Sequence, residues 1–485
     1  MNNTTNLPTW TTLERESFFA AIARHRSAAR RITLLSNACA FALGVVVAIL
    51  MSPLFYAVLG LLLDIVNFIV PMPDLFKITM DNVMPIIDAL DSPQSVPLAR
   101  LVYIGATAAL PGVVVMGFVM LALSRIMREA TMSGAGNFTV RAADPTVLAE
   151  QRFGNVVHEM AVAANLKLPR VFIIDSDAAN AAAFGEDGDH TTIVMSSGML
   201  ASLSRDEMQG VAAHLVGSIA NGDMAVGTQV ATTLSLFGLV ARLSEFMSDK
   251  EGALRFLKLL RTAMRHGSST ADGELALELT NPFSSTRPPV QREVDPDKLA
   301  NKSDWRALLW MPLAGPLLIT GFFGGMLSML LLSPLLAWAW RRRKLLADAT
   351  AVRLTRNPNA LGEALIKVIG MPTAGAFAPW SAHMSVVHSE LIGAKGMFGS
   401  AGAKMFPALA KRIRALAGMG ATLTVPTARS NWQRVPVKIK LLVVPLLALC
   451  GALLCVVVYL LALVSVALSG MFTWVPAVIL DAILR

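Results

Sequence analysis

The sequence predicts a mostly α-helical, polytopic membrane protein with roughly four or five transmembrane helices and a cytoplasmic α+β domain that contains a small antiparallel sheet. Three observations lead to this fold class. The composition is far more apolar than that of a soluble domain, with 54% hydrophobic residues and a mean hydropathy of +0.57. Long apolar runs divide the chain. Helix and strand patterns alternate in the polar stretch that follows the second run.

Each predicted span is an apolar run that is long enough to cross about 30 Å of hydrocarbon. The fourth run carries Gly, Pro and Ser, so we expect it to tilt, kink or continue past the membrane. The third run holds several Thr, Gln and Ser residues and is the weakest of the five. The runs cover residues 34–63, 98–123, 224–240, 308–340 and 441–468.

Charged residues predict how these spans are oriented. Basic residues at 24–31 precede the first run and basic residues at 341–344 follow the fourth, so the positive-inside rule places both in the cytoplasm of a bacterial-type inner membrane. The acidic loop 64–97 is expected to face outward. The net charge of +9 then reflects this topology and an attraction to the lipid bilayer. Nucleic-acid binding is not expected, because no basic helix or aromatic platform accompanies the charge.

The cysteines indicate neither a disulfide framework nor a cysteine zinc site. Cys39, Cys450 and Cys455 all lie inside apolar runs, where helix packing explains them.

The soluble stretch begins with a helix pattern and continues with two strands. Apolar residues recur at helical spacing within 144–166, and β-branched runs follow at 170–175 and 191–196. Ser204 and Glu207 form a capping-box pattern that marks where the next helix begins. We expect the two strands to pair in the antiparallel sense beside that helix.

The helix at 205–223 has the frame of a zinc-peptidase helix, but key residues are replaced. Such a helix carries two histidines one turn apart that bind zinc, and a glutamate after the first histidine that takes a proton from zinc-bound water. His214 holds the first histidine position. Leu215 stands where the base would be, and Ser218 stands where the second histidine would be.

The order of motifs along the chain carries a family resemblance. N-x-V-x-E-M-A type residues at 155–161 are followed by PRVFIID at 169–175, NAAAFG at 180–185, SGML at 197–200, RDEM at 205–208 and AH at 213–214. Farther along, RKLLAD at 343–348 and FPALAKRIRAL at 406–416 continue the pattern. Over residues 28–416 the chain resembles the HtpX-type membrane zinc metallopeptidases, with the CAAX prenyl endopeptidases as more distant relatives.

This resemblance implies a zincin-like peptidase domain and a setting in protein quality control. It places the third zinc ligand of the family at Lys344 and a carboxylate that supports the first histidine at Asp348. It places a histidine of the family at Phe406. The vestigial ligand positions are therefore His214, Ser218 and Lys344, of which one still carries a ligand.

These departures predict a pseudopeptidase. Serine is a poor zinc ligand at neutral pH, an ammonium group repels a divalent cation, and Leu215 cannot accept a proton. We therefore expect no catalytic residue and no bound metal. The alternative is an active zinc endopeptidase that uses non-standard ligands, with His214 joined by His158, His383 or an acidic side chain. A transporter or channel is disfavoured, because the apolar runs nearly lack charges.

Two interpretations of Lys344 remain open. Its ammonium group could pair with Asp348 one helical turn away and fill part of the volume that zinc would take. It could instead extend to the lipid surface together with the arginines at 341–343. For His214 the simpler interpretation is a buried histidine that is hydrogen-bonded to a carboxylate.

Without hydrolysis, the function would be binding. The small sheet could hold an extended segment by strand addition. Expected partners are unfolded or membrane protein segments or a partner protease, and the chain could form a homo-oligomer. The candidate peptide-binding residues are Asn180, Ala181, Thr192, Ile193 and Val194.

The predicted domain organisation follows from the apolar runs and the polar stretches between them. Its parts are a cytoplasmic arm (1–30), a transmembrane helical pair with a short outer loop (31–132), the first part of the zincin-like domain (138–223), hydrophobic helices with a polar loop at 244–305 (224–340), the second part of that domain with a tether (341–439), and a C-terminal transmembrane helix with an interfacial tail (440–485).

Overall fold

The computed structural model describes two long N-terminal helices, a small sheet and the helices around it. The described residues are 16–67, 98–132, 140–185, 191–230, 332–369, 384–387 and 405–423, together with isolated residues between 69 and 88, between 232 and 236, and at 371.

Helices α1 (Phe18–Asn67) and α3 (Leu98–Met132) occupy the first two predicted spans. Within the described parts of the chain, no helix combines the length and the apolar content needed to cross a membrane. The prediction of transmembrane helices at these two places is therefore wrong. Part of the apolar surface of α1 is used inside the protein, because Leu43 and Val47 are buried in a cluster with residues of the sheet. The other predicted spans lie wholly or partly outside the described residues.

The sheet contains four strands in the order β1-β2-β4-β3. The strands are β1 (Val140–Ala142), β2 (Arg170–Ile174), β3 (Ala181–Gly185) and β4 (Thr191–Ser196). The predicted strands at 170–175 and 191–196 are confirmed as β2 and β4.

The sheet is mixed, so the prediction of an antiparallel sheet is wrong. β2 and β4 run parallel, whereas β1 pairs with β2 and β3 pairs with β4 in the antiparallel sense. The reason lies in the segment between the two predicted strands, which forms β3. The chain reverses direction on each side of β3 and returns to run alongside β2. The alanines of β3 have low strand propensity, so the sequence pattern did not reveal it.

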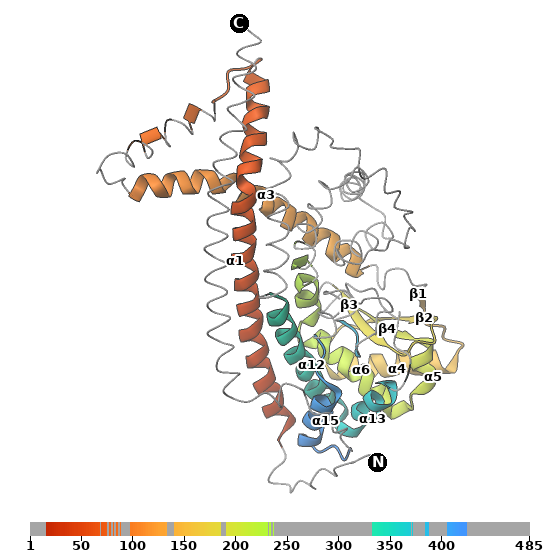
Figure 1. Ribbon diagram of the computed structural model, residues 1–485. Coiled ribbons are helices and arrows are strands. Elements are labelled where there is room, and N and C mark those ends of the chain that lie inside the picture. The colour runs from red at the N-terminus through yellow and green to blue at the C-terminus, as the bar shows by residue number, and fades with distance from the viewer. Residues whose placement is uncertain are drawn as a thin grey trace, which may run out of the picture.

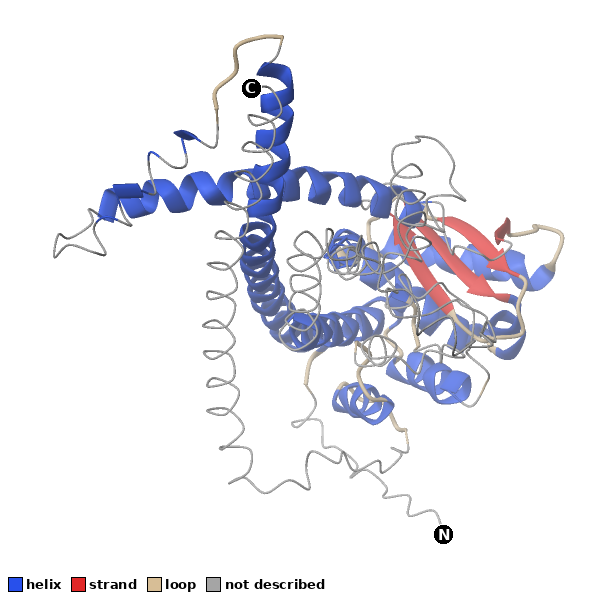
Figure 2. Ribbon diagram, turned by 45° about the horizontal axis from the view of Figure 1, so that its top comes forward, coloured by secondary structure: helices blue, strands red, loops and turns tan. Residues whose placement is uncertain are grey.

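Both faces of the sheet are covered. Alternate strand residues such as Ala181 and Ile193 join a core with α4 (Leu148–Ala163) and α6 (Arg205–Ala220). The intervening residues, such as Phe184 and Val194, join a second cluster with α12 (Ser333–Thr355) and α1. Helix α5 (Ser197–Ser202) follows β4 directly. Figures 1 and 2 show the sheet beside these helices. Burial on both faces explains why β3 and the middle of β4 carry apolar residues at successive positions.

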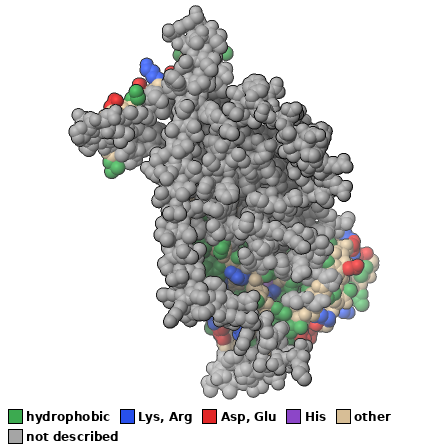
Figure 3. Space-filling view, viewed as in Figure 1, with side chains coloured by type: hydrophobic (Ala, Val, Ile, Leu, Met, Phe, Trp, Pro, Cys, Tyr) green, Lys and Arg blue, Asp and Glu red, His purple; other side chains and the backbone are tan. Residues whose placement is uncertain are grey.

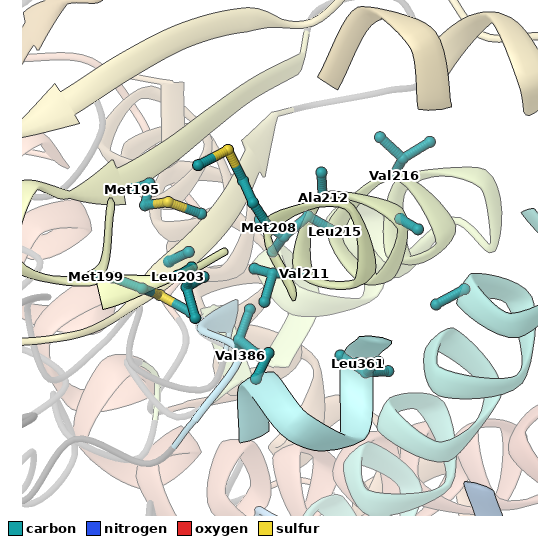
Figure 4. Packing of buried hydrophobic residues seen from close by; sticks show 14 of the residues in the cluster. Met195, Met199, Leu203, Met208, Val211, Ala212, Leu215, Val216, Leu361 and Val386 are labelled. Carbon is teal, nitrogen blue, oxygen red and sulfur yellow. The ribbon is translucent and has the colours of Figure 1, made fainter. Parts of the chain in front are cut away.

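Helix α6 lies at the centre of the domain. Its predicted capping box is confirmed, because the Ser204 side chain accepts from the Glu207 backbone and the Glu207 carboxylate accepts from the Ser204 backbone. Most residues of α6 are buried, and Figure 4 shows its apolar side chains packed against Met195, Met199 and Leu361. Helices α13 (Pro358–Ile369) and α15 (Leu409–Gly418) complete this side of the core.

Two glycines of α6 allow its neighbours to approach closely. A Cβ atom on Gly217 would lie 3.0 Å from the Cβ of Thr350 on α12. A Cβ atom on Gly210 would lie 2.5 Å from the backbone nitrogen of Leu361 on α13. The first contact brings α6 and α12 together where His214 and Asp348 face each other.

The described surface beside the sheet mixes acidic, basic and hydrophobic side chains (Figure 3).

Candidate functional site

Three buried side chains from three helices form a chain of charge-assisted contacts. Nδ1 of His214 on α6 lies 2.8 Å from Oδ1 of Asp348 on α12. Arg412 on α15 donates to the same carboxylate through Nε at 2.9 Å and Nη2 at 2.7 Å. His214 and Asp348 are completely buried, and Arg412 is 3% exposed. The two-pronged arginine contact supplies the countercharge that a buried carboxylate requires.

The surroundings keep the histidine neutral and the carboxylate ionised. Burial lowers the pKa of His214 to about 4, against the opposing pull of Asp348. Burial by itself raises the pKa of Asp348, but the Arg412 charge and the contact with His214 outweigh it, so the pKa lies well below its usual range.

This protonation state fixes the tautomer of His214. A neutral imidazole whose Nδ1 lies 2.8 Å from a carboxylate oxygen carries its proton on Nδ1, facing Asp348, although the contact lacks the alignment of a regular hydrogen bond. Nε2 then presents a lone pair, and among the described residues it has no hydrogen-bond partner. The imidazole is therefore oriented as a zinc-binding histidine would be.

The second ligand position is engaged elsewhere. The Ser218 hydroxyl donates to Oδ2 of Asp223 at 2.5 Å, and Nη1 of Arg343 lies 3.1 Å from Oδ1 of the same carboxylate. Burial raises the pKa of Asp223, while Arg343 and the Ser218 hydroxyl oppose that shift. Ser218 is thus one partner of a buried carboxylate.

Lys344 is buried, with 2% of its surface exposed, so it does not extend to the outside with its arginine neighbours. Its ammonium group donates to the backbone oxygens of Met384 at 3.3 Å and Ser385 at 2.5 Å. It also lies over the rings of Trp340 at 5.9 Å and Phe406 at 5.6 Å. Asp348 is paired with Arg412 instead, which differs from the expected Lys344 to Asp348 pair. Burial, followed by the charge of Arg412, lowers the pKa of Lys344 to about 7.

The former base position is part of the hydrophobic core. Leu215 is 1% exposed and belongs to the cluster beneath the sheet (Figure 4). Phe406 packs against the second cluster and carries the cation–π contact with Lys344.

The described side chains do not fit a zinc ion held by three protein ligands. No group of three or more His, Cys, Asp or Glu side chains that could hold a metal ion occurs among the residues that the structure describes. His158, one proposed substitute ligand, is exposed on α4, whereas His214 is completely buried. His383, another proposed substitute, lies outside the described residues.

The predicted peptide-binding residues fall on two different strands. Thr192, Ile193 and Val194 lie on β4, whose two edges are both occupied by neighbouring strands. Of the strands that carry these residues, only β3 is terminal in the sheet; Ala181 begins it and Asn180 precedes it. The Asn180 side chain donates to the backbone oxygen of Val387 at 3.1 Å.

Two features of the site were missed in the sequence. Arg412, which neutralises Asp348, lies in the FPALAKRIRAL segment at 406–416, so the resemblance there contained a signal for it. The segment 384–387, which contacts Lys344, Arg412 and Asn180, showed no recognisable pattern.

Known proteins resemble the part of the chain that contains His214 and Ser218. The family described as Peptidase family M48 matches residues 148–294. The chain is 30% identical over 156 residues to a protein named Protease HtpX homolog from Burkholderia multivorans, which covers 32% of this chain and 55% of the relative. It is 30% identical over 214 residues to a protein of the same name from Ligilactobacillus salivarius, which covers 44% of this chain and 56% of the relative.

The chain thus spans about half the length of the curated relatives that it matches. No solved structure matches it.

Proposed function

Because the chain is an HtpX-type member of peptidase family M48, we propose that it is a pseudopeptidase that binds polypeptide segments without hydrolysing them. It would hold unfolded segments for a quality-control protease or act as a partner of that protease.

The observation that carries this proposal is the engagement of the former ligand positions. Nε2 of His214 presents a lone pair that no described residue engages. The Ser218 hydroxyl donates to Asp223, and the Lys344 ammonium donates to two backbone oxygens. A zinc ion that activates water needs three protein ligands and a nearby base, and Leu215 offers no base.

A binding role is supported by the edge of the sheet. β3 is the terminal strand on the side of His214 and α6, and strand addition at such an edge recognises backbone independently of sequence. An M48 domain that has lost hydrolysis would keep this means of holding an extended chain.

Metal analysis and a hydrolysis assay on the purified full-length protein test the proposal together. We expect substoichiometric zinc and no cleavage of an unfolded, fluorescein-labelled protein in the presence of added zinc. His214→Ala is then expected to change neither result. His158→Ala, an exposed histidine on α4, is the matched control.

Stoichiometric zinc that disappears in His214→Ala but persists in His158→Ala would overturn the proposal. That result would establish the alternative, a zinc endopeptidase with non-standard ligands.

We further propose that the protein works at the bacterial inner membrane. The apolar composition and the resemblance to membrane peptidases support this location. Recovery of the full chain in the membrane fraction after cell lysis and ultracentrifugation is the expected result. Recovery in the soluble fraction would contradict it.

A further inference from the structure

A short segment of this chain lies along the edge of β3. Ser385 pairs with Ala182 in the antiparallel sense, and the Val386 backbone nitrogen donates to the Ala181 oxygen at 2.8 Å. The segment 384–387 therefore occupies the edge at which an added strand would bind.

The side chain of Asn180 holds the end of this segment. Its Nδ2 donates to the Val387 oxygen at 3.1 Å, and its Oδ1 accepts from the Val387 nitrogen at 3.4 Å. One amide side chain thus reproduces both hydrogen bonds that a neighbouring strand would make to a single residue.

Side chains from distant elements bind the remaining backbone oxygens. The Lys344 ammonium on α12 donates to the oxygens of Met384 and Ser385. Nη1 of Arg412 on α15 donates to the Val386 oxygen at 2.7 Å. Every backbone oxygen from 384 to 387 therefore accepts a hydrogen bond, and the donors are a lysine amine, an arginine guanidinium and an asparagine amide. These donors can recognise the backbone of an extended chain whatever its side chains are.

The way in which Asn180, Lys344 and Arg412 bind this segment differs from ordinary strand pairing in a core. A core strand is held mainly by backbone ladders, whereas most of the hydrogen bonds described for this segment come from side chains. Lys344 stands at a former zinc-ligand position, so the donors to the segment converge on the place where a peptidase of this family would hold its substrate.

From this geometry we propose that segment 384–387 is an internal strand that fills the polypeptide-binding groove, so that an external extended polypeptide binds along β3 only when the segment is displaced. This inference rests on the proposed binding function. It adds that segment 384–387 and an external polypeptide cannot occupy the edge of β3 at the same time.

A reversible cross-link tests the exclusion. Ala182 and Ser385 face each other directly across the bridge, a position at which Cβ atoms come close enough for a disulfide. The variant Ala182→Cys/Ser385→Cys is made in a background that carries Cys39→Ser, Cys450→Ser and Cys455→Ser. The probe is a fluorescein-labelled, reduced and carboxymethylated α-lactalbumin, which stays unfolded. Binding is followed by fluorescence anisotropy.

We expect the oxidised variant to bind the probe at least about tenfold more weakly than the same protein after reduction, because the cross-link removes the open state. Ala182→Cys alone, treated with the same oxidant, is the matched control and is expected to bind in both conditions.

Equal affinity of the oxidised and reduced forms would overturn the exclusion while leaving the binding function in place. If neither the reduced variant nor the parent background binds the probe, the proposed binding function itself fails, and the inference fails with it.

Discussion

Nδ1 of His214 and Oδ1 of Asp348 lie 2.8 Å apart, and neither side chain is exposed. The helices that carry them, α6 and α12, approach closely at Gly217. The carboxylate of Asp348 thus orients the His214 imidazole inside the protein core. The pair is a buried contact between a neutral imidazole and an ionised carboxylate. Its contribution to the free energy of unfolding can be measured.

The stability of the protein is expected to fall as the pH drops from about 6.5 to about 4, and His214 is one cause, beside His25 on α1, whose pKa burial also lowers to about 4. The folded-state pKa is lowered, so in this window the unfolded chain binds a proton at His214 that the folded chain does not. A shift from 6.5 to about 4 corresponds to roughly 3 kcal/mol of unfolding free energy. Thermal unfolding midpoints recorded across this pH range measure it.

His214→Gln is the matched variant, because a glutamine amide can donate to Asp348 but does not titrate. Its melting temperature should decline less steeply between these pH values than that of the parent. Identical slopes would show that the histidine is not buried in its neutral form.

Removal of Arg412 is expected to destabilise the protein strongly. Arg412→Ala leaves the Asp348 carboxylate buried with only the neutral imidazole beside it, and loss of one partner of a buried ion pair costs about 3–5 kcal/mol. Arg414→Ala, an exposed residue of the same helix, should change stability by less than about 0.5 kcal/mol. Urea unfolding followed by circular dichroism compares the two. Similar midpoints for both variants would contradict the buried pair.

The sequence predicted the location of individual helices and strands better than the direction in which the strands pair. The capping box at Ser204 and the strands now seen as β2 and β4 follow from side-chain patterns, and each was located correctly. The direction of β4 depends on β3, whose alanines resemble neither a strong strand nor a turn. Hydropathy alone was also insufficient for α1, whose apolar residues partly pack against the domain.

In the candidate site, too, positions along the chain were predictable from sequence but contacts between distant residues were not. The helical frame at 205–223 drew attention to His214 and Ser218, and the family resemblance drew attention to Lys344. Neither could show what Lys344 contacts, because its acceptors are backbone oxygens some 40 residues away along the chain. Backbone acceptors carry no side-chain signature, so neither composition nor spacing could have indicated segment 384–387.

Gly210→Ala is expected to destabilise the protein by about 1–3 kcal/mol. The added methyl group would lie 2.5 Å from the Leu361 nitrogen, so α13 would have to move away from α6. Gly154→Ala provides the control, because its Cβ meets no atom within 4 Å and alanine favours the helix. That variant should be as stable as the parent or slightly more so. A Gly210→Ala protein with an unchanged melting temperature would disprove the close packing of these helices.

Restoring the lost side chains should restore metal binding. In Leu215→Glu/Ser218→His/Lys344→Glu, two histidines lie one turn apart on α6, and a carboxylate replaces the ammonium on α12, the helix that faces them. The new histidine can use the volume that the lysine side chain leaves.

We expect about one zinc per chain after dialysis, and a melting temperature that falls when a chelator is added, because bound metal stabilises the folded state. The parent protein should show no effect of the chelator. The same variant with His214→Ala should lose the zinc, which would show that His214 supplies one ligand. If the restored variant melts cooperatively yet binds no zinc, then positions 214, 218 and 344 do not form a zinc-site frame, and the interpretation of a lost site is wrong.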